Sequence, residues 1–177
     1  MSIVMDADRM GRTLTRIAHE ILERNRGLED LALIGIRTRG VPIAKRIGQT
    51  IRDINQHELP TGALDITLYR DDLSKVAAHP VLQSSDIPFS VDDKDLVVVD
   101  DVLYTGRTIR AAMNGLFDLG RPKRVRLCVL IDRGHRELPV EATFIGRTVQ
   151  TSDAEIIEVR LNEIDREERV VLVERVP

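Results

Sequence analysis

The chain has 177 residues, of which 42% are hydrophobic, so it is long enough for one domain with a substantial core. Its formal net charge of −3 and pI of about 5.8 exclude a uniformly basic nucleic-acid-binding surface and leave only a local patch for any polyanion. The single cysteine, Cys128, excludes an intrachain disulfide. We see no signal peptide or membrane span in the sequence and expect a soluble, cytoplasmic protein.

Strand-like and helix-like segments alternate along the chain, which predicts an α/β fold with a mostly parallel sheet flanked by helices. In the first half, the patterns predict a helix over 6–26, a buried strand over 31–36, a helix over about 42–54 and a strand over 64–69. Residues 70–90 show little periodicity and predict a long loop. In the second half, the predicted elements are a buried strand over 96–99, a helix following Thr108, a strand over 125–131, a short strand near 142–146, and edge strands over 155–161 and 169–174.

The segment LVVVDDVLYTGRT, residues 96–108, carries the strongest chemical signal. Its first four residues form an unbroken hydrophobic run, typical of a strand buried on both faces of a parallel sheet. Asp100 and Asp101 follow at the carboxyl end of this strand, where ligands bind in open α/β sheets. Because ionised carboxylates only accept hydrogen bonds, the pair suits the two hydroxyl groups of a diol.

The turn that follows combines hydroxyl groups with a glycine. Thr105, Gly106, Arg107 and Thr108 lead into a predicted helix, whose free N–H groups and dipole would hold a phosphate. Gly106 allows the backbone to approach that phosphate closely. Either half of the segment alone would usually be an ordinary loop or helix cap. Together they predict neighbouring diol and monophosphate sites, as a ribose 5-phosphate requires.

A second anion site is predicted at RTRG, residues 37–40, which also follows a buried strand. Arginine forms charge-assisted and often bidentate hydrogen bonds to phosphate. An isolated RTRG would be interpreted as a solvated turn. Beside the first site, it indicates a substrate with phosphate groups at both ends, such as phosphoribosyl pyrophosphate (PRPP).

The segment 96–108 resembles the PRPP motif of type I phosphoribosyltransferases, with Tyr104 where the generic motif prefers a small residue. Four further segments extend the resemblance over nearly the whole chain, to the PyrR family of bifunctional pyrimidine operon attenuation regulators and uracil phosphoribosyltransferases. They are LTRIAHEILERNRG, IGIRTRGVPIAKRI, LDITLYRDDLSK and LIDRGHRELPVEATFIGR. The resemblance implies a single phosphoribosyltransferase domain over 1–177. It also implies a flexible loop at about 70–90 and a small hood formed by about 132–177 with part of the N-terminal region.

The resemblance also implies the activity and the partners. The reaction is pentosyl transfer from PRPP to uracil, giving UMP and pyrophosphate, with Mg²⁺ held through PRPP rather than by a dedicated protein ligand. UMP would promote binding to a hairpin in the leader of pyr messenger RNA, and the protein would form homodimers or larger homo-oligomers, away from any membrane. A phosphoribosyltransferase without an RNA function and a non-catalytic sensor of PRPP or UMP remain alternatives.

Site residues follow from the motifs and the resemblance together. The catalytic residues are Asp100, Asp101 and Arg39. Further contacts to PRPP or UMP are predicted for Thr38, Gly40, Val102, Leu103, Tyr104, Thr105, Gly106, Arg107, Thr108 and Arg133. The resemblance places polar contacts of the flexible loop on Tyr69, Arg70 and Asp72, and the base-binding part of the hood on Phe144, Ile145 and Val149.

The first predicted helix carries a basic stripe. Arg9, Arg12, Arg16 and His19 recur at spacings of three, four and three residues, beside the hydrophobic face of the helix. Without the resemblance, we would interpret this stripe as a solvated face. The family pattern assigns RNA contacts to Thr15, Arg16, His19, Arg136 and Arg147, and Arg24 and Arg26 extend the positive surface. Glu141 stands where the family commonly has a basic residue, which would weaken phosphate binding there.

Overall fold

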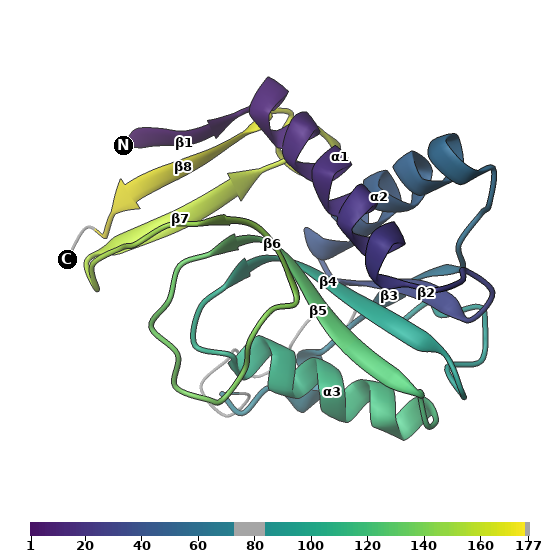
Figure 1. Cartoon of the computed structure of the whole chain (residues 1–177). Helices are drawn as coiled ribbons and strands as arrows, with labels where there is room; N and C mark the ends of the chain where they lie inside the picture. The colour runs from purple at the N-terminus through teal and green to yellow at the C-terminus, as the bar shows by residue number, and fades with distance from the viewer. Residues whose placement is uncertain (73–83, 176–177) are drawn as a thin grey trace.

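The computed structural model describes residues 1–72 and 84–175 and contains two β-sheets (Figure 1). In the first half of the chain the elements are β1 (Ser2–Asp6), α1 (Ala7–Arg24), β2 (Leu31–Ile36), α2 (Gly40–Asn55), β3 (Thr61–Leu64) and the short 3₁₀ helix η1 (Thr67–Tyr69). In the second half they are β4 (Asp95–Leu103), α3 (Arg107–Leu119), β5 (Arg124–Asp132), β6 (Phe144–Thr148), β7 (Glu155–Arg160), α4 (Asn162–Asp165) and β8 (Arg169–Glu174).

The larger sheet has the strand order β3-β2-β4-β5-β6, and all of its neighbouring strands are parallel. In Figure 1, α1 and α2 cover one face of this sheet and α3 covers the other. Successive side chains of β2 therefore enter different cores: Leu31 and Leu33 pack with α1 and α2, whereas Ala32 and Ile34 pack with α3. Burial on both faces explains the unbroken hydrophobic runs in the sequence, and the predicted α/β class is confirmed.

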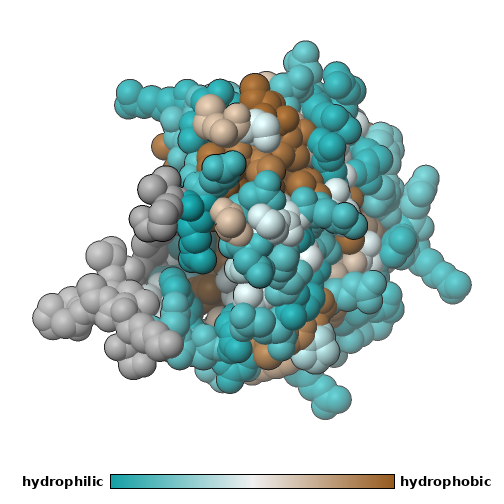
Figure 2. Space-filling view, turned by 90° about the vertical axis from the view of Figure 1, so that its left-hand side faces the viewer, coloured by the Kyte–Doolittle hydropathy of each residue, from teal (hydrophilic) through white to brown (hydrophobic). Residues whose placement is uncertain are grey.

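The smaller sheet, which we call the hood sheet, has the antiparallel order β1-β8-β7. Its inner face joins the core beneath α1 through Ile157, Val159 and Val170. On the side of the molecule shown in Figure 2, hydrophobic side chains gather in the upper part among polar ones. Two hydrophobic side chains are exposed at β1, those of Met1, just before the strand, and of Ile3, within it.

Four features of the fold differ from the sequence prediction. β1 and α4 were not predicted, and β8 lies in the middle of the hood sheet rather than at an edge. β1 is only five residues long and pairs with residues more than 160 positions away, so no local pattern announces it. The predicted strand over 64–69 is wrong, because β3 ends at Leu64. There the Asp65 carboxylate accepts hydrogen bonds from the N–H and hydroxyl groups of Thr67 and turns the chain into η1.

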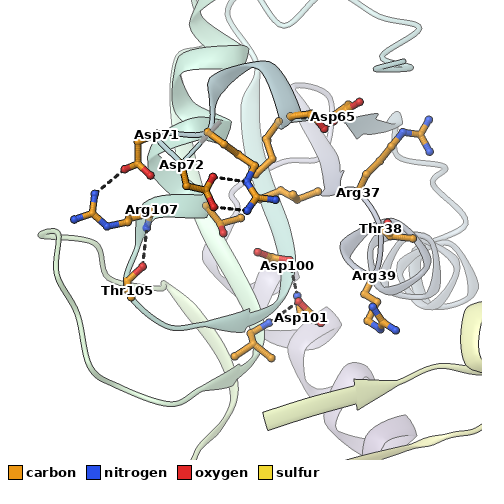
Figure 3. Close-up of a pocket in the computed structure, with 16 residues that line it drawn as sticks. Arg37, Thr38, Arg39, Asp65, Asp71, Asp72, Asp100, Asp101, Thr105 and Arg107 are labelled. Carbon is orange, nitrogen blue, oxygen red and sulfur yellow. Dashed lines mark hydrogen bonds and ion pairs between the residues drawn. The ribbon is translucent and has the colours of Figure 1, made fainter. Parts of the chain in front are cut away.

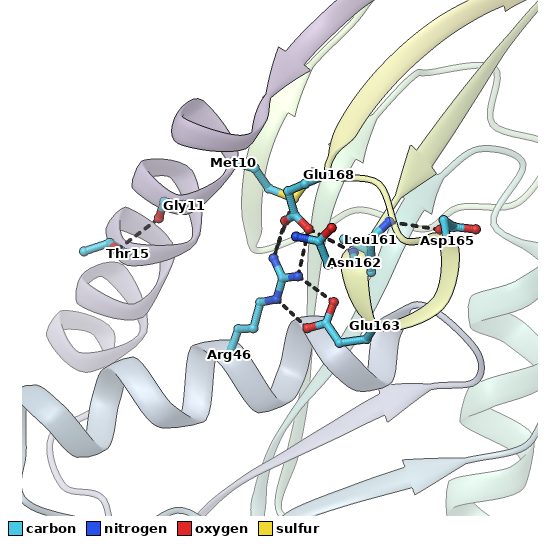
Figure 4. A network of polar contacts seen from close by, with 9 residues as sticks. All are labelled: Met10, Gly11, Thr15, Arg46, Leu161, Asn162, Glu163, Asp165 and Glu168. Carbon is cyan, nitrogen blue, oxygen red and sulfur yellow. Dashed lines mark hydrogen bonds and ion pairs between the residues drawn. The ribbon is translucent and has the colours of Figure 1, made fainter.

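Arg46 on α2 fixes the chain around α4 to the parallel-sheet core (Figure 4). Its guanidinium group forms ion pairs with Glu163, at 2.6 Å, and with Glu168. The Glu168 side chain is only 13% exposed, and its carboxylate also accepts a hydrogen bond from the Asn162 N–H group. A carboxylate that is mostly removed from water needs a cationic partner to offset the cost of burying its charge.

We predict that Arg46→Ala lowers the free energy of unfolding by about 2 kcal/mol. In this variant the mostly buried Glu168 carboxylate loses its cationic partner and keeps only the hydrogen bond from the Asn162 N–H group. The matched control is Arg52→Ala on the same helix, whose pair with Glu58 spans 3.8 Å between two exposed side chains. This control should cost less than about 0.5 kcal/mol. Thermal unfolding of the two variants measures the difference, and equal shifts would show that Arg46 does not anchor this segment.

Candidate active site

A pocket of about 620 Å³ opens at the carboxyl ends of β2 and β4 (Figure 3). Segments from four parts of the chain line it: the end of β2 with the following turn, the chain after β3, the end of β4 and the start of α3. The lining residues are Ile36, Arg37, Thr38, Arg39, Asp65, Ile66, Thr67, Arg70, Asp71, Asp72, Asp100, Asp101, Val102, Thr105, Arg107 and Thr108. The structure thus brings both predicted anion-binding turns and the acidic pair into one pocket.

The acidic pair lies within β4 rather than after it, since this strand runs on to Leu103. The Asp100 carboxylate accepts a hydrogen bond from the Asp101 N–H group at 2.9 Å, and the Asp101 carboxylate accepts one from the Val102 N–H group at 2.9 Å. Asp100 is buried, and this burial raises the pKa of its carboxyl group well above the ordinary value. The neighbouring Asp101 carboxylate raises the pKa of Asp100 further.

The hydroxyl-rich turn has the geometry of an anion site. Gly106 adopts a left-handed conformation, with φ of 93°, immediately before α3 begins at Arg107. An added Cβ at Gly106 would also lie 3.1 Å from a methyl carbon of Val140. Thr105, Arg107 and Thr108 line the pocket at the start of α3, and the Arg107 N–H group donates to the Thr105 hydroxyl oxygen at 3.3 Å.

The RTRG turn lies directly against β4. An added Cβ at Gly40 would be 2.2 Å from the Val99 carbonyl oxygen, so only glycine permits this approach. The peptide bond between Arg37 and Thr38 is cis. In Figure 3 the acidic pair lies between this turn and the Thr105–Arg107 turn. The pocket can therefore hold an anion at each end and hydroxyl groups between them.

Two arginines of the pocket already have carboxylate partners that the sequence prediction did not include. Arg39 forms an ion pair with Asp165 of α4, at 2.7 Å, and Arg107 pairs with Asp71, at 2.6 Å, and Glu137, at 2.7 Å. Asp165 is 126 positions from Arg39, and no sequence signal connects them. Asp71 could have been noticed, because it lies between two residues that were singled out in the same acidic and basic run.

The predicted loop residues take different positions. Arg70 and Asp72 line the pocket and form a two-bonded ion pair, at 2.9 and 2.6 Å. Tyr69 instead points to α3, where its hydroxyl group donates to Asp118 at 2.7 Å. Most of the remaining predicted loop, 73–83, lies outside the described residues.

The predicted base-binding residues do not line this pocket. Phe144 is fully buried in the core beneath the Arg24 guanidinium group, and Ile145 and Val149 are partly buried at the edges of the two cores. Their contact with a base stays a prediction.

Other predicted substrate contacts also lie outside the pocket wall. Arg133 is buried, donates to the Glu155 carbonyl oxygen at 2.8 Å, and stacks on Tyr104 with 4.0 Å between its Cζ and the ring centroid. Leu103 is a core residue.

The predicted RNA-contacting residues fall into three groups. Thr15, Arg16 and His19 are exposed on α1, and Arg16 and Arg147 share a pocket of about 340 Å³ between α1, β1 and β6. Arg26 lies past the other end of α1. Arg136 stabilises the turn after β5, because its guanidinium group donates hydrogen bonds to the Tyr104 carbonyl oxygen at 2.9 Å and to the Asp132 carboxylate at 2.6 Å. The structure does not bring these groups into one cluster.

In the part of the chain that the structure describes, none of the helices combines the length and hydrophobicity needed to cross a membrane.

Residues 2–164 match the family described as the phosphoribosyl transferase domain. Several similar proteins carry the name "Bifunctional protein PyrR", and three of them illustrate the similarity. Those of Pelotomaculum thermopropionicum, Thermus thermophilus and Clostridioides difficile are 58%, 55% and 54% identical, each over 97% of this chain and over 94%, 95% and 97% of their own lengths.

Solved structures share the fold at low identity. The hypoxanthine phosphoribosyltransferase of Trypanosoma cruzi aligns with a TM-score of 0.75 at 16% identity, covering 99% of this chain and 98% of that one. The hypoxanthine-guanine phosphoribosyltransferase of Bacillus anthracis aligns with a TM-score of 0.74 at 18% identity, covering 98% of each chain.

We predict that Asp100→Asn stabilises the protein near pH 7, by about 1 kcal/mol or roughly 2–4 °C in Tm. Because burial raises the pKa of Asp100 in the folded state, its carboxyl group opposes folding as the pH rises above the ordinary value of about 4. The gain should therefore vanish near pH 4 and grow toward neutrality. Asp53→Asn, at an exposed position, is the control and should change Tm little at any pH. A pH-independent gain, or a loss of stability, would contradict the prediction.

Proposed function

The chain belongs to the phosphoribosyl transferase domain family, among the bifunctional PyrR proteins, and we propose that it is a uracil phosphoribosyltransferase that also regulates pyrimidine genes by binding RNA. The observation that carries the proposal is the pocket in which the acidic pair lies between two anion-binding turns. Identity of 51–58% to the PyrR relatives over nearly the whole chain supports uracil as the base. The reaction converts uracil and PRPP into UMP and pyrophosphate.

Catalysis rests on positioning and electrostatics. Breaking the bond between C1 of the ribose and the pyrophosphate oxygen creates positive charge on the sugar and negative charge on the leaving group. Asp100 and Asp101 accept hydrogen bonds from the ribose hydroxyl groups and stabilise the cationic sugar. The turn from Thr105 to Thr108 holds the 5-phosphate, and the turn from Thr38 to Gly40 holds the pyrophosphate, with Arg39 neutralising its charge.

The donor set fits a magnesium ion that arrives with PRPP. Asp100 and Asp101 place negative charge beside the site assigned to the ribose hydroxyl groups, so a Mg²⁺ ion held there by PRPP itself would be favoured without a dedicated protein ligand. Mg²⁺ bound there with the substrate would neutralise charge on the pyrophosphate.

The regulatory function uses surfaces outside the pocket. UMP bound in the pocket promotes binding of a leader hairpin of pyr messenger RNA to the basic face of α1, where Arg16 lines a pocket with Arg147 of β6 and His19 is exposed. We expect this activity in the cytoplasm and in a homodimer or larger homo-oligomer, because a dimer doubles the surface of a small RNA-binding domain.

We predict that the purified protein releases pyrophosphate from PRPP and Mg²⁺ with uracil, and not with orotate, hypoxanthine or guanine. The double variant Asp100→Asn, Asp101→Asn should lose at least about 100-fold in kcat, since the groups that stabilise the cationic sugar become neutral. Thermal unfolding of the variant verifies that it is folded. Turnover with a different base would refute uracil specificity, and RNA binding without any turnover would favour the sensor alternative.

We also predict that Asp165→Asn lowers kcat/KM for PRPP about tenfold. Asp165 holds the Arg39 guanidinium group at 2.7 Å, and its other carboxylate oxygen accepts a hydrogen bond from the Leu161 N–H group, so it positions Arg39 at the mouth of the pocket. An amide keeps the shape of the side chain but loses the charge that orients Arg39. Steady-state kinetics with PRPP and inhibition by pyrophosphate give the measurement.

The matched control is Glu163→Gln, on the same short helix, which pairs with Arg46 instead of Arg39. It should leave kcat/KM within about twofold. In Arg39→Lys, the Asp165→Asn change should cost less than it does alone, because the two residues act as a pair. Additive losses in the double variant would remove Asp165 from this positioning role.

A further inference from the structure

A second basic pocket, of about 550 Å³, lies at the end of the parallel sheet opposite the candidate active site. The chain after α1 and the first residues of β4 and β5 form it. Its five cationic residues, which we call the amino-end cluster, are Arg24, Arg26, Lys123, Arg124 and Arg126. Three carboxylates also line the pocket, those of Glu29, Asp30 and Asp95. Five cations against three anions give this site a net charge of +2, in a chain whose net charge is −3.

The cations of this cluster are incompletely compensated. Arg126 is half-buried, and its guanidinium group donates to the neutral side-chain amide of Asn25 at 3.2 Å. Burial lowers the pKa of Arg126, and repulsion from Arg124 and Arg24 lowers it further. Arg124 approaches Asp95 only at 3.5 Å. A bound anion would relieve this repulsion, so the site favours a ligand with phosphate groups.

The amino-end cluster lies at the carboxyl end of α1, where Arg24 follows Glu23 and Glu20, the partner of Arg16. Arg16 donates to the Gly146 carbonyl oxygen of β6 at 2.6 Å, and Arg24, two turns further along α1, lies over the Phe144 ring of the same strand. The other end of α1 borders the pocket that holds Arg9 and Arg147. Fifteen residues separate Arg9 from Arg24, or roughly 22 Å of helix, so basic sites flank α1 at both ends. This length suits a polyanion that lies along the helix better than a single small anion.

We propose that the amino-end cluster binds backbone phosphates of the same RNA that contacts α1, which extends the RNA surface to the first residues of β4 and β5. The inference rests on the proposed RNA-binding function and adds Lys123, Arg124 and Arg126 to it. The cluster lies at the opposite end of the strands from Asp100, so PRPP and UMP in the active site do not reach it. The contacts are to phosphates and not to bases, so they add affinity and salt dependence without sequence specificity.

The test compares RNA binding by the full-length protein and by the double variant Arg124→Ser, Arg126→Gln. The probe is a hairpin transcribed from the leader of the pyrimidine operon of the source organism, titrated with UMP at several salt concentrations. Loss of two phosphate contacts should weaken binding about tenfold and reduce the slope of log K against log salt by about 1.5. Lys45→Gln, Arg52→Gln is the charge-matched control, from two exposed positions on α2, and should keep the slope of the unchanged protein.

Pyrophosphate release with uracil should be unaffected in the double variant, which shows that it is folded. Should Arg126→Gln disturb packing, the variant Lys123→Gln, Arg124→Gln, at two exposed positions, tests the same change of slope. Binding by the unchanged protein with equal slopes in all variants would overturn the inference alone. Absence of RNA binding by the unchanged protein would overturn the proposed RNA function, and the inference with it.

Discussion

The close packing of the RTRG turn on β4 is the constraint on which the candidate site depends. A Cβ atom on Gly40 would stand 2.2 Å from the Val99 carbonyl oxygen, and one on Gly35 would stand 2.5 Å from the Gly40 carbonyl oxygen. Two missing side chains thus let the turn lie beside the residue that precedes Asp100. The distance between the RTRG turn and the acidic pair is set by backbone contact, which is stiffer than contact between long side chains.

The acidic pair has an electrostatic cost, and other charged residues of the pocket form ion pairs. Asp100 is buried and next to the Asp101 carboxylate, and both features raise the pKa of Asp100 and make the fold less stable near neutral pH than it would be with a neutral side chain there. Two arginines of the pocket are oriented by carboxylates, Arg39 by Asp165 and Arg107 by Asp71. Their guanidinium groups are therefore held in place at the pocket by the protein itself, which reduces the cost of ordering them around an anion.

Local sequence predicted the parts of the fold and the site that depend on local chemistry. The buried strand at 31–36 was placed to the residue, and the residues that line the pocket from both turns were named, because hydrophobic runs, glycine and hydroxyl groups report on their immediate surroundings. Pairings over long distances in the chain were missed: β1 with β8, and Asp165 with Arg39. Phe144 and Ile145 lie on β6 and Val149 directly follows it, and the sequence could not show that Phe144 is fully buried while the other two are only partly buried against the cores.

The segment around α4 shows how one small domain can link the two functions. Asp165 holds Arg39 in the pocket, and Glu163 and Glu168 hold Arg46, whose guanidinium group also contacts the Met10 sulfur atom of α1. The segment therefore contacts the pocket through Arg39 and α1 through Arg46, and the fully buried Leu161 side chain anchors it in the core. Coupling between two sites requires an element that both of them contact, and the segment around α4 meets this requirement, because it contacts Arg39 of the pocket and, through Arg46, the helix that carries the proposed RNA contacts.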